Sequence, residues 1–236
     1  SINAALKLTA FSNNVNLVKW TSTGTKITTV NVRYDLYNGN GANAIPGDAD
    51  DYAGIIQDLV PIASGAAGVT WNPAPDVSNN PRIRVVDTAN ANVKADSPTF
   101  KIIGGLTLTA PTGGLTWIAK STTNNISWSF SGSISSVKVY YDSNSGKGAD
   151  NIAGNADDYN SNLPIATVAQ VGSSGTTNYL WNPMPDTVTN SGRIKITNAA
   201  DEANVYSIGT DFNIGAQFDL TQPEGGHIAY STESYD

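Results

Sequence analysis

The sequence predicts an all-β protein that consists of two tandem β-sandwich domains. Short stretches in which apolar and polar residues alternate recur along the chain, and this period of two is typical of half-buried strands. Clusters of Gly, Asn, Asp, Ser and Pro separate the stretches and supply the turns. The acidic residues comprise 17 Asp and only three Glu, which favours turns over helices because Asp forms turns and Glu forms helices.

An internal repeat divides the chain. The clearest collinear matches are Val30–Tyr34 with Val137–Tyr141, Gly47–Tyr52 with Gly154–Tyr159, and Trp71–Asp76 with Trp181–Asp186. We therefore expect one domain over residues 1–104, a second over 105–216, and a partial third repeat over 217–236.

The predicted strands indicate two facing sheets in each unit. Asn125–Phe130 alternates so that Ile126, Trp128 and Phe130 share one face. Several short strands in each unit of about 105 residues, with turn signals between them, are typical of a two-sheet sandwich. We expect Trp128 and Trp181 to fill the space between the sheets.

The second unit also resembles a known family. The segments that carry the resemblance are Leu106–Gly114, Trp117, Asn125–Trp128, Val137–Tyr141, Tyr179–Trp181, Arg193–Ile194 and Phe212–Ile214. They resemble the immunoglobulin-like repeats of bacterial and archaeal secreted multidomain proteins, which are related to the Kre9-like cell-wall domain. The resemblance implies two tandem immunoglobulin-like sandwiches and a role as a spacer, stalk or wall-associated module. Long Gly/Asn/Asp-rich insertions, 38–52 and 144–159, depart from the family.

Composition makes several classes of function unfavourable. A net charge of −7 argues against binding to nucleic acid or to an anionic membrane surface. There is no cysteine, and His227 is the single histidine, so thiolate catalysis, a Ser-His-Asp triad and a multi-histidine metal site are disfavoured. We expect a non-enzymatic protein with no membrane insertion. Because Ser, Thr, Asn and Gly carry its polarity, we expect it outside the cell.

The Asp-rich insertions suggest a calcium site. Calcium takes six to eight oxygen ligands from carboxylates, amides and backbone carbonyls, and the insertions bring many of these together. The candidate ligands are Asp35, Asp48, Asp50, Asp51, Asp142, Asp150, Asn155, Asp157 and Asp158. The alternative is that the loops bind no ion and use Asp and Asn for local hydrogen bonds to the backbone.

The two ends of the sequence suggest a means of assembly. Phe218–Gly226 parallels Leu106–Gly114, whereas the interval from Leu6 to Trp20 is eight residues shorter than that from Leu106 to Trp128. One interpretation is a piece of a longer array with a divergent first repeat. The other is that the tail of one subunit adds a strand to the first domain of the next, which would build a fibre. The residues expected to bind the partner are Phe218, Leu220, His227, Ile228 and Tyr230.

Taken together, the sequence favours an extracellular structural subunit of a surface filament, appendage or layer, with a homopolymer as the expected partner. The alternative is an adhesin segment that binds carbohydrate or a protein partner, such as a cell-surface glycan, through the insertion loops. A spacer attached to an enzyme is a third interpretation.

Overall fold

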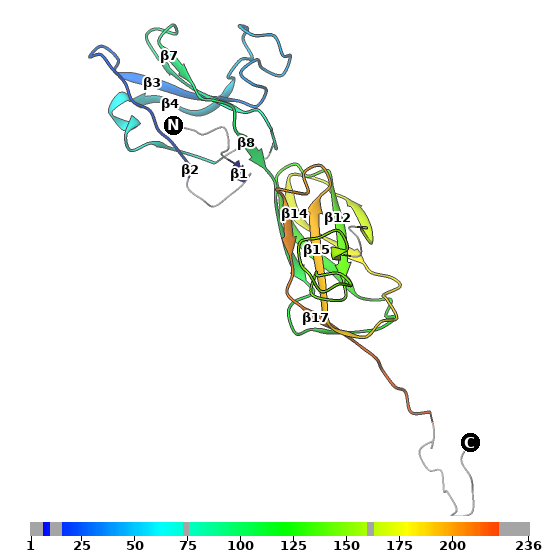
Figure 1. Cartoon of the computed structure of the whole chain (residues 1–236). Coiled ribbons are helices and arrows are strands. Elements are labelled where there is room, and N and C mark those ends of the chain that lie inside the picture. Colours follow the sequence, from blue (N-terminus) through cyan, green and yellow to red (C-terminus); the bar gives the residue numbers. More distant parts are fainter. Residues whose placement is uncertain (1–6, 10–15, 73–75, 160–162, 222–236) are drawn as a thin grey trace, which may run out of the picture.

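The computed structural model describes residues 7–9, 16–72, 76–159 and 163–221. The described residues form strands, turns and loops, as the sequence predicts, with one short 3₁₀ helix (η1, Ile62–Gly65) and two helical residues at 158–159. No helix within these ranges is long and apolar enough to cross a membrane. Figure 1 shows two groups of strands that follow one another along the chain and meet where β8 leads into β9. The exact domain boundaries stay predictions.

The second group of strands is an immunoglobulin-like β-sandwich. Its strands are β9 (Gly105–Ala110), β10 (Thr116–Ile118), β11 (Asn125–Ser131), β12 (Ser136–Asp142), β13 (Ala166–Ala169), β14 (Ser174–Leu180), β15 (Thr189–Asn198), β16 (Tyr206–Ile208) and β17 (Phe212–Gly215). One sheet has the order β14-β11-β9, and the other has the order β10-β17-β15-β12-β13, with β16 paired to β15. The first two strands of the unit thus belong to different sheets, as is usual in this fold.

The core of the second unit lies between these sheets. Trp128 is fully buried, and Trp181 is buried in the same cluster, which confirms the expectation for both tryptophans. The alternation predicted for β11 is also confirmed, since Ile126, Trp128 and Phe130 are all buried. Ring contacts join Trp181 to Tyr141 at a centroid distance of 4.8 Å. Such apolar burial is the main stabilising contribution to a sandwich of this kind.

The first group of strands repeats most of this arrangement. Its strands are β1 (Lys7–Thr9), β2 (Asn16–Val18), β3 (Thr29–Asp35), β4 (Gly54–Pro61), β5 (Val69–Trp71), β6 (Arg82–Asp87), β7 (Lys94–Asp96) and β8 (Lys101–Ile103). The sheet β4-β3-β6-β7 corresponds to β13-β12-β15-β16, and the pair β2-β5 corresponds to β11-β14. A separate core contains Val32, Trp71, Phe100 and Ile102.

The position of β1 corrects the alignment of the first repeat. β1 pairs in parallel with β8, in the way that β10 pairs in parallel with β17. Leu8 lies opposite Ile102, as Trp117 lies opposite Ile214. The segment around Leu8 is therefore the counterpart of β10 and not of β9, the counterpart implied by comparing Leu6 with Leu106 in the sequence. Within the described residues of the first unit, β9 has no counterpart.

Candidate functional site

Two buried aspartates organise the insertion loops from inside. Asp35 ends β3, Asp142 ends β12, and each is 5% exposed. The Asp142 carboxylate accepts hydrogen bonds of 2.6–3.3 Å from the backbone N–H groups of Asn144, Gly146, Gly148 and Tyr159. The Asp35 carboxylate accepts bonds of 2.6–3.1 Å from the N–H groups of Tyr37, Gly39 and Gly41. A carboxylate that accepts several N–H groups is stabilised in its charged form without a cation.

Glycine is required where the second loop passes its tyrosine. Gly146 has a φ of +74°, and a Cβ added there would lie 2.6 Å from the hydroxyl oxygen of Tyr159. Tyr159 is itself buried, and the ammonium of Lys195 lies 5.3 Å from its ring centroid. In the first loop, the guanidinium carbon of Arg84 lies 3.8 Å from the ring centroid of Tyr52. Each loop is thus held against its sheet by a buried tyrosine beneath a cationic side chain.

Three of the predicted calcium ligands come together in the first loop. Asp48, Asp50 and Asp51 each place one carboxylate oxygen within 4.8 Å of the others. The same carboxylates accept loop hydrogen bonds, such as the 2.6 Å bond from the N–H of Gly47 to Asp51. The cluster can supply part of a calcium shell, and its mutual repulsion would be relieved by a cation. Calcium binding here stays a prediction.

The second loop arranges its predicted ligands around local bonds. Oδ2 of Asp157 accepts from the N–H groups of Ala149 and Asp150, at 2.8 and 3.2 Å. Oδ2 of Asp158 accepts from the N–H of Gly154 at 2.7 Å. These contacts are those expected if Asp and Asn are present for backbone hydrogen bonding, the alternative that the sequence left open.

A side-chain pair with exchanged partners supports the same interpretation. In the first loop the amide of Asn43 donates to the carboxylate of Asp48 at 2.7 Å. At the equivalent positions of the second loop the amide of Asn155 donates to the carboxylate of Asp150, also at 2.7 Å. Amide and carboxylate have changed places while the hydrogen bond remains. A role in bonding the two ends of each loop explains this exchange.

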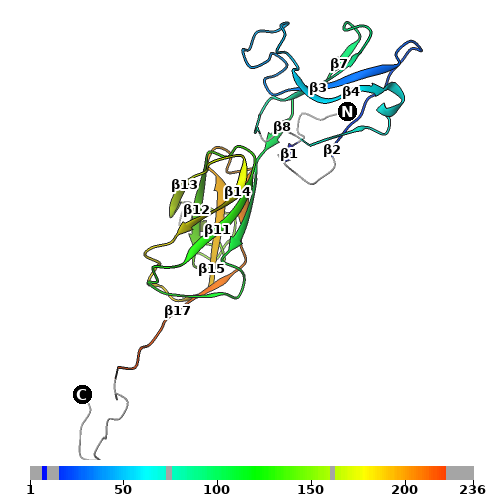
Figure 2. The ribbon, with the colours of Figure 1, turned by 180° about the vertical axis from the view of Figure 1, so that it is seen from behind.

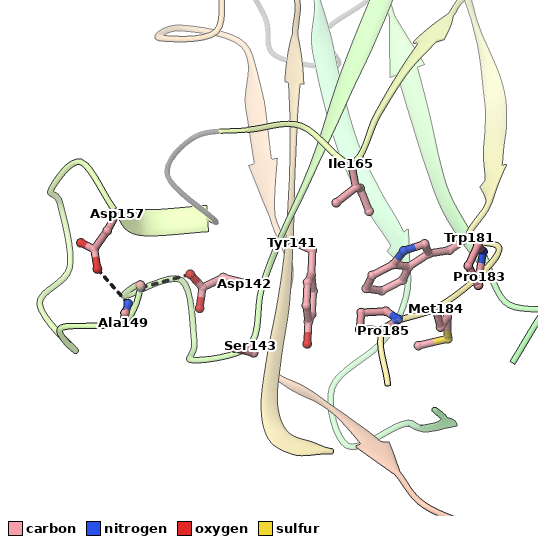
Figure 3. A pocket seen from close by; sticks show the side chains of 11 residues that line it. Tyr141, Asp142, Ser143, Ala149, Asp157, Ile165, Trp181, Pro183, Met184 and Pro185 are labelled. Carbon is pink, nitrogen blue, oxygen red and sulfur yellow. Dashed lines mark hydrogen bonds between the residues drawn. The ribbon is translucent and has the colours of Figure 1, made fainter. Parts of the chain in front are cut away.

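A pocket of about 620 Å³ lies between the second loop and the segment after β14 (Figure 3). Tyr141 and Trp181 line it, together with Met184. The Tyr141 hydroxyl is buried and has no hydrogen-bond partner among the described residues. Burial, with the nearby charge of Asp142, raises the pKa of Tyr141 to about 12. The hydroxyl is thus a neutral hydrogen-bonding group at neutral pH and not a base.

Among the described residues, β2 of the first unit is paired on one side, whereas its counterpart β11 in the second unit is paired on both. β11 lies between β14 and β9, whereas β2 pairs with β5 alone among the described strands. β11 extends to Ser131, but β2 ends at Val18, and the residues that follow it, 19–23, are outside any sheet. An unpaired edge exposes backbone N–H and C=O groups that can accept another strand.

Two of the residues predicted to bind a partner are described, and both are exposed. Phe218 is 95% exposed and Leu220 is 87% exposed, and neither belongs to a strand. Their counterparts in the repeat, Leu106 and Leu108, pack against the core of the second unit. His227, Ile228 and Tyr230 lie outside the described residues.

The comparisons with known proteins are weak. No protein-family model matches the sequence, and no curated protein matches it. Among solved structures, the chain is similar to the fibronectin(III)-like modules of Clostridium thermocellum CbhA, at 13% identity and a TM-score of 0.24, over 91% of this chain and 90% of that one. It is also similar to dimeric latent PorU of Porphyromonas gingivalis, at 11% identity and a TM-score of 0.25, over 86% of this chain and 18% of PorU.

The coarse immunoglobulin-like fold therefore follows from the sheet order described above, and kinship with Kre9-like domains stays a resemblance. Sequence reasoning suggested that the first domain could accept a strand but did not place the edge beside Trp20, and it missed the pocket around Tyr141. The shorter interval before Trp20 was the available signal for the edge. The interval is shorter because the described residues of the first unit contain no counterpart of β9 or of the turn that follows it.

Proposed function

We propose that the chain is a non-enzymatic, extracellular structural subunit of a surface filament, appendage or layer, and that it joins end to end with other copies through residues 217–236. The supporting observation is the exposure of Phe218 and Leu220. They alternate with polar residues in a segment that repeats the sequence of β9. A strand-like segment with two large apolar side chains in water is suited to adding to a sheet edge.

The energy available to such a contact is appreciable. Burying one Leu or Phe side chain contributes about 1.5–3 kcal/mol. Two side chains therefore contribute about 3–6 kcal/mol before the backbone hydrogen bonds of the added strand are considered. Part of this energy offsets the ordering of the tail. The resemblance to repeats that serve as spacers and stalks agrees with such a connecting role.

A second candidate function is recognition of a glycan or a protein partner by the second unit. The observation that favours it is the pocket in which the hydroxyl of Tyr141, which has no hydrogen-bond partner among the described residues, lies near the ring of Trp181 (Figure 3). Sugar-binding sites combine an aromatic surface with hydrogen-bonding groups, and both are present. Trp181 is buried, however, so its ring offers little area for stacking. We therefore rank this function below assembly.

The decisive experiment compares the whole chain with a chain that lacks residues 218–236. Light scattering after size-exclusion chromatography measures the mass, and electron microscopy of negatively stained samples shows any polymers. We expect the whole chain to form linear polymers and the truncated chain to be a folded monomer. Equal masses for the two chains would contradict the proposal. Binding of the monomer to a glycan array, with no polymer, would favour the second candidate.

A further inference from the structure

We infer that the first unit of one copy binds residues 217–221 of a second copy at the strand position that β9 fills in the second unit and that no described residue fills in the first, in a groove beside Trp20–Thr23. This inference rests on the proposed function and adds to it the acceptor surface and the register. The second unit supplies the template, because there the same strand position is filled by β9.

The template defines how the strand pairs. β9 runs antiparallel to β11, with Leu108 opposite Trp128 and Leu106 opposite Phe130. Leu106 and Leu108 face the core, and Thr107 between them is exposed. The N–H of Leu108 also donates to the side-chain oxygen of Ser207 in β16, at 3.0 Å. β9 therefore closes the sandwich by bridging its two sheets.

The first unit has a pocket of about 250 Å³ at this place. It is lined by residues that lie outside any sheet, among them Trp20, Thr21, Ser22, Ile27 and Val93, and by residues of the sheet β4-β3-β6-β7, such as Val85. Residues of the pocket are more exposed than their counterparts in the second unit. Val93 is 42% exposed, whereas its counterpart Val205 is 3% exposed. Trp20 and Ile27 are only partly buried, whereas Trp128 and Ile134 are buried. The uncovered apolar surface lies where β9 would cover it.

The segment 217–221 matches the pattern of the strand that fills this position in the second unit. Superposing the repeat places Leu220 opposite Trp20, Asp219 opposite Thr21, and Phe218 opposite Ser22. In the second unit the large side chain of this last pair, Phe130, is on the acceptor strand, opposite Leu106. In the first unit the acceptor residue is the small Ser22, and the donor residue is the large Phe218. Phe218 is larger than Leu106, its counterpart in β9, and would occupy part of the space that Ser22 leaves beside it.

The occupant comes from another copy because of where the tail begins. In Figures 1 and 2, residues 216–221 leave β17 at the end of the second group of strands that lies away from the first group. The two views are related by a half-turn about the vertical axis and agree on this separation. A donor at one end and an acceptor at the other make a head-to-tail contact, which repeats along a line.

The inference is tested by separating donor from acceptor. Val93→Asp places a charge in the groove and leaves the tail intact, while deletion of residues 218–236 removes the tail and leaves the groove. We expect each variant alone to be monomeric and an equimolar mixture to form a one-to-one heterodimer, as measured by light scattering. Val171→Asp is the matched control, because Val171 is 91% exposed in the second unit, and this variant should polymerise like the unchanged chain.

The other outcomes show whether the groove or the proposed assembly itself is wrong. If Val93→Asp polymerises normally while the truncated chain is monomeric, the groove is wrong and assembly through the tail still stands. If both variants are monomeric but their mixture contains no heterodimer, the inference is again overturned. If the unchanged chain forms no polymer, the proposed function itself fails. Thermal unfolding of each monomer shows whether Val93→Asp has kept its fold.

Engineered cysteines test the register, which is straightforward because the chain has none of its own. Thr21→Cys in the truncated chain should form a disulfide with Asp219→Cys in the Val93→Asp chain, since directly opposite Cβ atoms lie about 4.5–5.5 Å apart. Thr221→Cys is the control, because a diagonal neighbour lies about 7–8 Å away. A disulfide with Thr221→Cys in place of Asp219→Cys would overturn the register.

Discussion

Replacing Asp142 with asparagine tests whether the second insertion loop is held by one buried carboxylate. Oδ1 of Asp142 accepts the N–H groups of Asn144 and Gly146, and Oδ2 accepts those of Gly148 and Tyr159. Asparagine keeps one accepting oxygen and turns an NH₂ group toward the other two donors. Two bonds to a charged group are then lost, at about 1.5–3 kcal/mol each.

We therefore expect the free energy of unfolding of the second unit to fall by about 3–6 kcal/mol. This is a large share of the roughly 5–15 kcal/mol that stabilises a typical domain. Asp157→Asn is the matched control. Both of the backbone bonds of Asp157 go to the same oxygen, Oδ2, which the asparagine carbonyl can replace. We expect a loss of about 1 kcal/mol or less in that variant.

The assay is urea unfolding followed by tryptophan fluorescence, with amide hydrogen exchange of β12 and β15 to assign the loss to the second unit. Each variant is measured in a chelator and again with calcium. Asp142→Asn with the stability of the unchanged chain would refute the anchoring role. If calcium strongly raises the free energy of unfolding of the unchanged chain but not that of Asp142→Asn, the result would instead indicate that Asp142 is a metal ligand.

Three further predictions follow from the same contacts. If the acidic cluster of the first loop binds calcium, added calcium should raise the melting temperature of the unchanged chain, and Asp50→Asn should abolish this increase. No change in the melting temperature of the unchanged chain, measured by scanning fluorimetry, would contradict calcium binding. Leu220→Ala should leave the free energy of unfolding unchanged but weaken assembly about tenfold or more, because about 1.5–3 kcal/mol of burial energy is lost and each 1.4 kcal/mol is a factor of ten in affinity. Leu108→Ala should instead destabilise the second unit. Analytical ultracentrifugation measures the assembly, and urea unfolding measures the stability. Hydrogen bonds from Arg84 to Asp96 hold the pKa of Asp96 below its usual value, so this stabilisation is present above the unfolded pKa of about 3.9 and is lost as the pH falls through the lower folded pKa; Asp96→Asn should flatten the acid limb of the stability profile, and an unchanged limb would contradict the assignment.

The sequence predicted the strands because strand patterns are local. The alternation in Asn125–Phe130 requires no knowledge of the partners of β11, and the structure buries the expected residues. The place of β1 could not be predicted in the same way. Its three residues alternate equally well as a counterpart of β9 or of β10, and only its parallel pairing with β8, more than ninety residues further along, distinguishes them.

The acidic loops show a second limit of sequence reasoning. Calcium loops and hydrogen-bonded Asx loops both use Asp, Asn and Gly, because both need short oxygen-bearing side chains and a backbone that turns sharply. What separates them is whether a carboxylate faces N–H groups or other oxygens, and that depends on tertiary structure. Asp142 accepts from four backbone N–H groups, whereas Asp48, Asp50 and Asp51 accept loop hydrogen bonds and also bring carboxylate oxygens close to one another.

The duplication gives the molecule an internal comparison that bears on its assembly. One strand position is filled in the second unit by β9 and has no described occupant in the first unit, while a segment with the β9 pattern lies exposed after β17. A subunit with this arrangement is polar, since its acceptor and its donor are different surfaces. Contacts between such surfaces give a direction to the assembly, and a rotation that does not close produces a filament and not a ring. The β9-like segment lies after β17 and would fill the corresponding strand position in the first unit of the next copy. This one segment would then both link the copies and set the direction of the polymer.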